Sequence, residues 1–506
     1  MKLRSYFCLG CFLVLSSAFK AQSPSDIRIA ADETLHESIE QLRALLSLSN
    51  DAHYPDDLQL NISWLINAFS NLGFSTQRLP TDGIDILLAE KSFAGADKTV
   101  LVYLQIDGQP VDPGRWLQPN PFIPVLKEKV NMDWKILPWE TLEDKTIDPD
   151  WRIFCRSASD AKGPVSAFIT ALRIMQAKGW QPNFNLKVIM DCEEELGSPH
   201  LPDAVKQYRK QLEADMLVIF DGPRHISNRP TLTFGARGIT TMRLTTYGPR
   251  VPQHSGHYGN YAPNPALKLA QLLASMKDDR GRVTIPGFYD GIHLDSMTRV
   301  VLAAVPDDEA VIRENLGIAE PDGVADTYQE SIQYPSLNIQ GMSSAWVGTK
   351  VRTIVPAAAV ANIDIRTVKE SDPQRLVELV IQHIISQGYH ICAGEPTEEE
   401  RKNYPKLISL SYEISYEAFR TDFTEDVSLW CDRALTRFFG VTPIKIRTSG
   451  GSIPIAPFVQ TLGLPAVTVP IVNRDNNQHS PNENIRIGNY LEGIYTYLAL
   501  LTQSIE

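Results

Sequence analysis

The chain has 506 residues, of which 43% are hydrophobic, and a formal net charge of -12 at pH 7. A single hydrophobic core stops growing at roughly 250–300 residues, so this length favours two domains. The acidic balance, without a dominant basic patch, argues against nucleic acid as a partner. Beyond the N-terminus, no apolar segment approaches the roughly 20 residues that a membrane-spanning helix needs.

The first 21 residues have the pattern of a secretory signal peptide. Lys2 and Arg4 form a positive start, residues 6–15 are apolar, and small residues follow as far as Ala21. This order predicts cleavage after Ala18 or Ala21 and a secreted protein, either periplasmic or extracellular. A buried N-terminal helix is the alternative interpretation.

The next elements alternate between helices and buried strands. Residues 31–72 carry leucine and isoleucine at helical spacing, and helical patterns recur at 164–177 and 201–212. Four short apolar runs are typical of strands in a parallel sheet: 100–106, 186–190, 216–220 and 466–471. This alternation predicts an α/β fold with a mixed, mostly parallel sheet and helices on both faces. Between these elements, the Pro- and Trp-rich residues 110–150 are predicted to form a long irregular loop.

The middle of the chain has a different pattern. Residues 232–246 and 359–368 alternate like strands with one exposed face, and helical patterns follow each of them at 264–276 and 373–387. We therefore expect a smaller α+β domain at 236–418, inserted between two segments of the α/β domain at 22–235 and 419–506.

Four cysteines lie beyond the predicted signal peptide. Cys155, Cys192, Cys392 and Cys431 match no metal-binding spacing and no dense disulfide framework. We expect small buried core residues, and the sequence leaves one disulfide open.

Acidic side chains gather where the predicted strands end. The groups that follow strands or begin a helix are Asp107, Asp160, Glu193, Glu194, Glu195 and Asp221, with His479 beyond the last strand. Because ligands of open α/β sheets bind at the carboxyl ends of the strands, we expect these groups to lie together. Taken singly, each also has an ordinary explanation as a solvated surface, a helix N-cap or a surface histidine.

A cluster of this kind needs compensating positive charge. Asp160, Glu194, Glu195 and Asp221 at one place would repel, and some would have to take up protons. Two divalent cations would compensate the charge, and carboxylate and imidazole ligands suit zinc or manganese. One carboxylate would remain free to take a proton from a water molecule.

These residues resemble, in order and over most of the chain, the motifs of the dimetal carnosinase, aminoacylase and glutamate-carboxypeptidase family, and most of all its carnosinase-like dipeptidases. The similar segments are residues 104–107, 109–112, 121–124, 159–163, 194–198, Asp221, 237–238, 254–259, 354–356, 365–366, 450–454 and 479–483. The resemblance implies a zinc-exopeptidase fold, a lid and dimerisation domain, and a homodimer.

The resemblance also implies a role for each site residue. Asp160 would bridge two metals, with Glu195 and His479 completing one site and Asp221 and the residue at 105 completing the other. The implied catalytic residues are Glu194 as general base, Asp107 orienting the residue at 105, and His254 stabilising the oxyanion in the partner subunit's site. The implied substrate-binding residues, which hold the carboxylate, are Arg366, Gly450, Gly451 and Ser452.

Position 105 departs from the family pattern, because Gln105 stands where the family has a metal-binding histidine. A glutamine offers a neutral carbonyl oxygen, a weak ligand for zinc, while its amide could donate to Asp107. Residues 155–157 and Ala161 also differ from the family motif. We expect two divalent ions with a weak second site, and one tightly held metal is the alternative.

We therefore expect a secreted metal-dependent amide hydrolase that acts next to a free carboxylate. Dipeptides, N-acyl amino acids and carbamoyl compounds all fit such a site. Two alternatives from other classes stay open: a non-catalytic protein that binds peptides or acyl amino acids, and an enzyme that runs amide synthesis or transfer.

Overall fold

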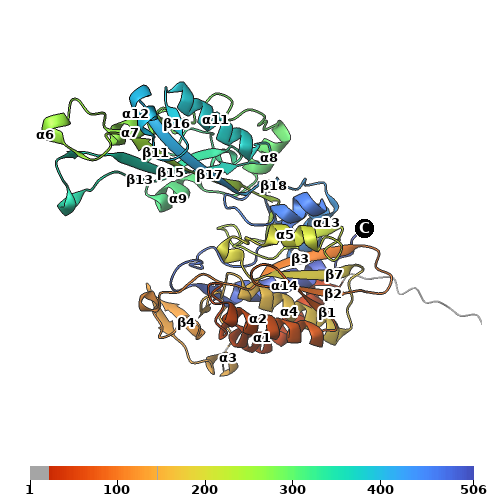
Figure 1. Ribbon diagram of the computed structural model, residues 1–506. Helices are drawn as coiled ribbons and strands as arrows, with labels where there is room; N and C mark the ends of the chain where they lie inside the picture. The colour runs from red at the N-terminus through yellow and green to blue at the C-terminus, as the bar shows by residue number, and fades with distance from the viewer. Residues whose placement is uncertain (1–21, 145) are drawn as a thin grey trace, which may run out of the picture.

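The computed structural model describes residues 22–144 and 146–506, so the predicted signal peptide lies outside the described residues. These form two bodies (Figure 1): a lower body of red, orange, yellow and blue segments and an upper body of green and cyan segments. The chain passes between them at the antiparallel pair β10 (Gly235–Ala236) and β18 (Phe419–Arg420). A Cβ on Gly235 would lie 2.4 Å from the backbone oxygen of Phe419, so the close crossing requires glycine.

The lower body is built on an eight-stranded sheet of order β1-β2-β7-β3-β8-β20-β9-β19. The central neighbours β7, β3, β8 and β20 run parallel, whereas β1 and β2 form an antiparallel edge. This arrangement confirms the predicted α/β class with a mixed, mostly parallel sheet. The strands are β1 (Ser75–Leu79), β2 (Ile86–Lys91), β3 (Thr99–Gln105), β7 (Asn185–Asp191), β8 (Met216–Ile219), β9 (Thr231–Thr233), β19 (Ile444–Ile446) and β20 (Ala466–Thr468).

Side chains of the central strands enter two cores, one on each face of the sheet. In β3, Val100 and Val102 pack on one face and Leu101 and Tyr103 on the other, as the two-residue repeat of a strand requires. Helices α1 (Pro24–Leu46), α2 (Pro55–Asn71), α4 (Lys162–Lys178), α13 (Asp426–Phe439) and α14 (Ile487–Leu501) share the first core. Helix α5 (Leu201–Gln207) and the π-turn η4 (Phe458–Leu462) share the second.

A four-stranded sheet of order β21-β6-β4-β5 corrects the prediction of an irregular loop at 110–150. A two-residue turn joins β4 to β5, and its first residue, Asn131, has a φ of 59°. Asparagine tolerates this left-handed conformation, which tight hairpin turns require. The elements are η1 (Pro113–Arg115), β4 (Val125–Val130), β5 (Asp133–Ile136), α3 (Thr141–Asp144), β6 (Arg152–Phe154) and β21 (Asn484–Arg486).

The upper body contains a five-stranded sheet of order β13-β15-β11-β17-β16. Helices α7 (Pro265–Ala274) and α11 (Pro373–Ser386) pack on it around one apolar core. The single strand predicted at 232–246 is divided, because β9 belongs to the lower sheet and β11 to the upper. The strands are β11 (Gly238–Tyr247), β13 (Ser336–Ser343), β15 (Ala358–Thr367), β16 (His390–Cys392) and β17 (Leu407–Tyr416).

Shorter elements complete the upper body and include three helices between α7 and β13 that the sequence pattern did not predict. They are β12 (Gln253–His254), α6 (Ser255–Tyr258), α8 (Ser296–Ala303), α9 (Glu309–Leu316), α10 (Tyr328–Ser331), η3 (Gly348–Lys350), β14 (Ile354–Val355) and α12 (Glu398–Asn403). Within the described ranges, no helix has the length and apolarity to cross a membrane. The four cysteines described are buried and free, as expected for core residues.

Candidate metal centre

Three neighbouring parallel strands deliver the polar residues to one edge of the lower sheet. Gln105 ends β3 and is followed by Asp107, while Asp221 follows β8 closely. The 3-10 turn η2 (Glu194–Leu196) follows β7. Because β7, β3 and β8 are adjacent and parallel, their carboxyl ends meet at the same edge.

Asp160 lies at the centre of this group. His479 Nε2 is 2.9 Å from Asp160 Oδ2 and 3.3 Å from Glu195 Oε2. One donor atom from each of these three residues lies within 4.8 Å of the others. Carboxylate oxygens and an imidazole nitrogen at such separations can hold a divalent cation after small adjustments.

The other carboxylates of the group carry raised pKa values. Burial, followed by the neighbouring Asp221, raises the pKa of Glu194 well above its usual value. Burial and then Asp160 raise the pKa of Glu195 to about 8 and that of Asp221 to about 7. The hydrogen bond to Asp160 raises the pKa of His479 to about 9. The positive groups of the protein around these carboxylates do not fully compensate their negative charge, and a bound cation would supply the remaining positive charge.

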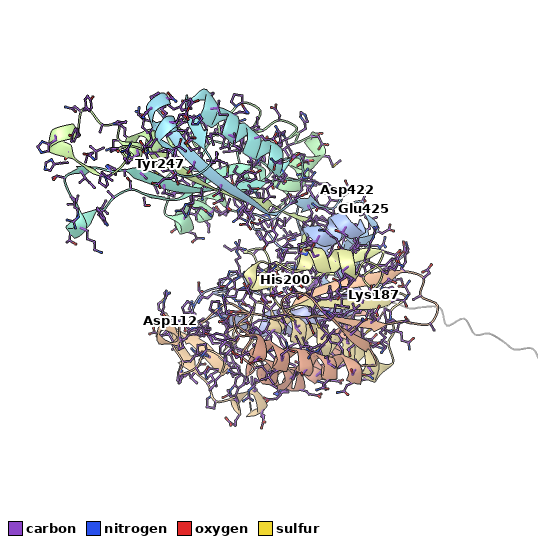
Figure 2. The ribbon with its side chains drawn as sticks, viewed as in Figure 1. Asp112, Lys187, His200, Tyr247, Asp422 and Glu425 are labelled. Atoms are coloured by element: carbon purple, nitrogen blue, oxygen red, sulfur yellow. The ribbon has the colours of Figure 1, made fainter. Side chains whose placement is uncertain are left out.

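The three glutamates at 193–195 do not all point to the same place. Glu193 Oε2 lies 2.7 Å from Nδ1 of His200, which Figure 2 labels in the lower body. Glu195 instead faces His479, and the charge of Asp221 acts on Glu194. The structure therefore brings Glu194 and Glu195 to the cluster and gives Glu193 a separate partner.

A buried carboxylate holds the loop that carries Asp160. Glu483 is completely buried and accepts hydrogen bonds from the backbone N–H groups of Ser157, Ser159 and Asp160, each at 2.9 Å. It also accepts bonds from the Ser159 hydroxyl and the Arg156 guanidinium. Glu483 lies within a motif that the sequence singled out, but nothing in the pattern indicated that it fixes Asp160.

Gln105 has a different partner from the one expected. Its Nε2 donates to Asp160 Oδ1 at 2.8 Å, and its Oε1 is buried without a hydrogen bond among the described residues. Asp107 accepts instead from the backbone N–H of Glu195 at 2.8 Å. The expected donation to Asp107 is therefore replaced by one to Asp160.

The residues expected to hold a carboxylate meet between the two bodies. Arg366 Nη1 of β15 donates to Ser452 Oγ at 2.8 Å, in the loop that contains Gly450 and Gly451. Arg237 lies close to Arg366. Burial, followed by the charge of Arg366, lowers the pKa of Arg237 to about 10. Two guanidinium groups so close together favour an anion. The family resemblance assigned the carboxylate to Arg366 and gave Arg237, which lies in the similar segment 237–238, no such role.

His254 does not join the carboxylate cluster of its own chain. It is exposed and forms the N-cap of α6, where its Nδ1 accepts from the backbone N–H of Gly256 at 3.0 Å. Helix α6 lies at the end of the upper body opposite β18, where the chain crosses to the lower body (Figure 1).

Comparisons with known proteins match most of the chain, including Asp160, the glutamates at 194–195, Asp221 and His479. The model of peptidase family M20/M25/M40 matches residues 124–503. The chain belongs to this family. It is 26% identical to the Cys-Gly metallodipeptidase DUG1 of Candida albicans, over 91% of this chain and 92% of that protein. It is 27% identical to the Beta-Ala-His dipeptidase of Mus musculus, over 72% of this chain and 73% of that protein.

Solved structures agree with this assignment. The M20 family metallo-carboxypeptidase Sso-CP2 from Sulfolobus solfataricus has a TM-score of 0.74 and 26% identity, covering 92% of this chain and 99% of its own. As a member of this family, the chain is therefore a metallopeptidase. This finding confirms the expected enzyme class and goes against the alternative of a non-catalytic binding protein.

The expectation of a secreted protein is wrong by the same comparisons. The Cys-Gly dipeptidases related to this M20 family chain are cytosolic enzymes. The prediction of secretion rested only on the order of positive, apolar and small residues at 1–21.

Proposed function

We propose that this chain hydrolyses dipeptides, by attack of a water molecule on the carbonyl next to a residue with a free carboxylate. The observation that carries the proposal is the meeting of Asp160, Glu195 and His479 beside Glu194 and Asp221 at one sheet edge. The relatives named above act on Cys-Gly and Beta-Ala-His, which are both dipeptides. N-acyl amino acids share the amide and the carboxylate and remain the second substrate class.

The donor set fits divalent cations. Asp160, Glu195 and His479 would hold one ion, and Asp160, Asp221 and Gln105 Oε1 a second one. The buried Gln105 Oε1 has no hydrogen-bond partner among the described residues, as a free donor atom would. Zinc or manganese held there would polarise the scissile carbonyl and favour ionisation of a water molecule.

Glu194 is the base in this proposal. Its pKa is raised by burial and by Asp221, so its carboxylate binds a proton more readily than a free glutamate does. A base of this kind takes a proton from the attacking water and returns it to the leaving amine. Asp107 fixes the turn that presents Glu194, because it accepts from the backbone of the next residue, Glu195.

The substrate carboxylate would lie between the two bodies. Arg366, Arg237 and the hydroxyl of Ser452 provide positive charge and a hydrogen-bond donor at the same place. A bidentate guanidinium is well suited to a carboxylate. Gly450 and Gly451 add no side chains to this loop, so a ligand can approach its backbone.

The oxyanion donor would come from a second copy of the chain. Strand β13 is an edge strand, and its residues 338–343 are exposed. Exposed apolar side chains lie in this strand and just beyond it: Met342 is 50% exposed, Trp346 49% and Val347 88%. An open apolar edge of this kind favours pairing with another strand. A homodimer built there would explain why His254 lies far from the carboxylates of its own chain.

The decisive experiment replaces the proposed base. We expect Glu194→Gln to lower kcat for a dipeptide by roughly 10²–10⁴-fold, as the loss of a general base does, while metal content stays near that of the native chain. Glu193→Gln is the matched control, because Glu193 faces His200 rather than the cluster. Full turnover by Glu194→Gln would refute the proposal.

A site with one tightly held metal is the second candidate, and Gln105 favours it. Its amide nitrogen donates to Asp160 Oδ1 at 2.8 Å, the oxygen that a bridging carboxylate would offer to the second ion. This candidate predicts that Gln105→His adds one ion per chain to the metal content of the native chain, measured by elemental mass spectrometry. An unchanged metal content in Gln105→His would contradict this candidate and support Gln105 as a ligand.

A further inference from the structure

A second group of potential metal ligands lies in the upper body, on the edge strand opposite β13. His390 and Cys392 are two residues apart on β16, so both side chains project from the same face of the strand. Glu400 reaches them from α12. One donor atom from each of His390, Cys392 and Glu400 lies within 4.8 Å of the other two.

Two of the three side chains are already oriented by a contact outside the group. The His390 ring stacks on Tyr404 with centroids 3.7 Å apart and planes inclined by 4°. Glu400 Oε2 accepts from the backbone N–H and the hydroxyl of Thr397 at 2.7 and 2.9 Å. This leaves Glu400 Oε1 directed at His390 Nε2, 3.1 Å away. Cys392 is 2% exposed and fixed by the strand.

The geometry points to a zinc site formed by His390 Nε2, Cys392 Sγ and Glu400 Oε1, which we propose as a structural tie of the upper body. Sulfur, nitrogen and oxygen donors together suit zinc, whose bonds of roughly 2.0–2.3 Å place tetrahedral donors about 3.5 Å apart. His390 Nε2 and Glu400 Oε1 are 3.1 Å apart, close to that value, and the distances to Cys392 Sγ are within 4.8 Å. Three protein ligands would leave the fourth position to a water molecule, one protein ligand fewer than in a closed structural zinc site.

Such an ion would hold an otherwise weak edge. Strand β16 pairs with β17 over three residues only in the described sheet, from the pair His390–Leu407 to the pair Cys392–Ser409. Tyr247 pairs with Leu407 from the other side of β17 and marks this region of the upper body in Figure 2. The site is thus remote from the carboxylates of the lower body.

Cobalt(II) tests the proposal without interference from the candidate metal centre, because a thiolate on cobalt gives an intense near-ultraviolet absorption and that centre offers no cysteine ligand. The full chain is freed of metal with a chelator and titrated with cobalt(II). We expect a thiolate band that is lost in Cys392→Ser and retained in Cys431→Ser, a buried cysteine of α13. His390→Gln keeps the thiol and should bind cobalt roughly tenfold or more weakly.

The same variants separate this site from catalysis. Zinc content should fall by one ion per chain in Cys392→Ser, while peptidase activity stays unchanged because none of the three residues belongs to the catalytic machinery. Absence of the band in the native chain, or its persistence in Cys392→Ser, overturns the proposal. In that case His390 and Glu400 form an ion pair that holds no metal.

Discussion

The carboxylates around Asp160 predict a specific dependence of stability on pH. In the metal-free chain the pKa values are raised to about 7 for Asp221, about 8 for Glu195 and about 9 for His479. A group whose pKa is raised in the folded state stabilises the fold below its unfolded pKa and loses that contribution as pH rises through the folded value. The chelated protein should therefore become less stable between about pH 4 and pH 9.

Metal binding should show the opposite dependence. An ion displaces the protons that these groups hold, so its apparent affinity should rise by about tenfold per pH unit for each proton released. Thermal unfolding with and without excess manganese at pH 5.5 and 8.5 measures both effects. A metal-induced shift in Tm of equal size at the two pH values would contradict this explanation.

At the scale of single residues, the common location of the carboxylates around Asp160 was predictable, but their orientations were not. Carboxylates after buried strands were predictable, because parallel strands end at a common edge. Which glutamate of 193–195 turns to His200, and whether Gln105 donates to Asp107 or Asp160, depends on partners far away in the chain. Likewise, the support that Glu483 gives to Asp160 connects residues 323 positions apart.

At the level of elements, strand β17 connects the upper body to the turn that carries Glu194. The hydroxyl of Tyr416, at its end, donates to the carbonyl of Gly197 at 2.6 Å. We expect Tyr416→Phe to lower the free energy of unfolding by about 1 kcal/mol, the net value of such a bond. It should also reduce kcat, because the position of η2 then varies more.

The control for this variant is on the same strand. Tyr412 is 43% exposed, and its hydroxyl has a long contact of 3.5 Å with Gln374. Tyr412→Phe should change neither denaturant unfolding nor steady-state kinetics. Equal effects of the two substitutions would show that the bond to Gly197 has no special role.

The sequence predicted those helices and strands whose hydrophobic residues recur with a clear period. Strands β3, β7, β8 and β20 were predicted because strands buried on both faces are continuous apolar runs. The hairpin of β4 and β5 was missed, since lysine and glutamate in β4 and tryptophan in β5 hide the alternation. The division of 232–246 between two sheets was also missed, because one strand pattern continues across the crossing at Gly235.

At the scale of the whole molecule, assembly should control activity. Met342→Lys places a charge on the exposed edge strand, and we expect it to convert the proposed homodimer to a monomer in light scattering after gel filtration. Without a partner's histidine, kcat should fall by roughly 10²–10³-fold, as it does when an oxyanion donor is removed.

A second lysine substitution serves as the control for assembly. Val300 in α8 is 64% exposed and lies outside the strand edge, so Val300→Lys should leave both mass and activity unchanged. A Met342→Lys monomer with full activity would show that His254 does not act between subunits.

The two crossings at β10 and β18 have a consequence for how this chain can change. They lie side by side, with Gly235 opposite Arg420 and Ala236 opposite Phe419. A short turn could therefore replace the whole insert without moving the ends that remain. Such a chain would keep every ligand proposed for the metal centre and lose Arg366 and His254. The residues proposed to hold metal ions thus all lie outside the insert, whereas the substrate carboxylate would be held from both sides, by Arg366 of the insert and Ser452 of the lower body.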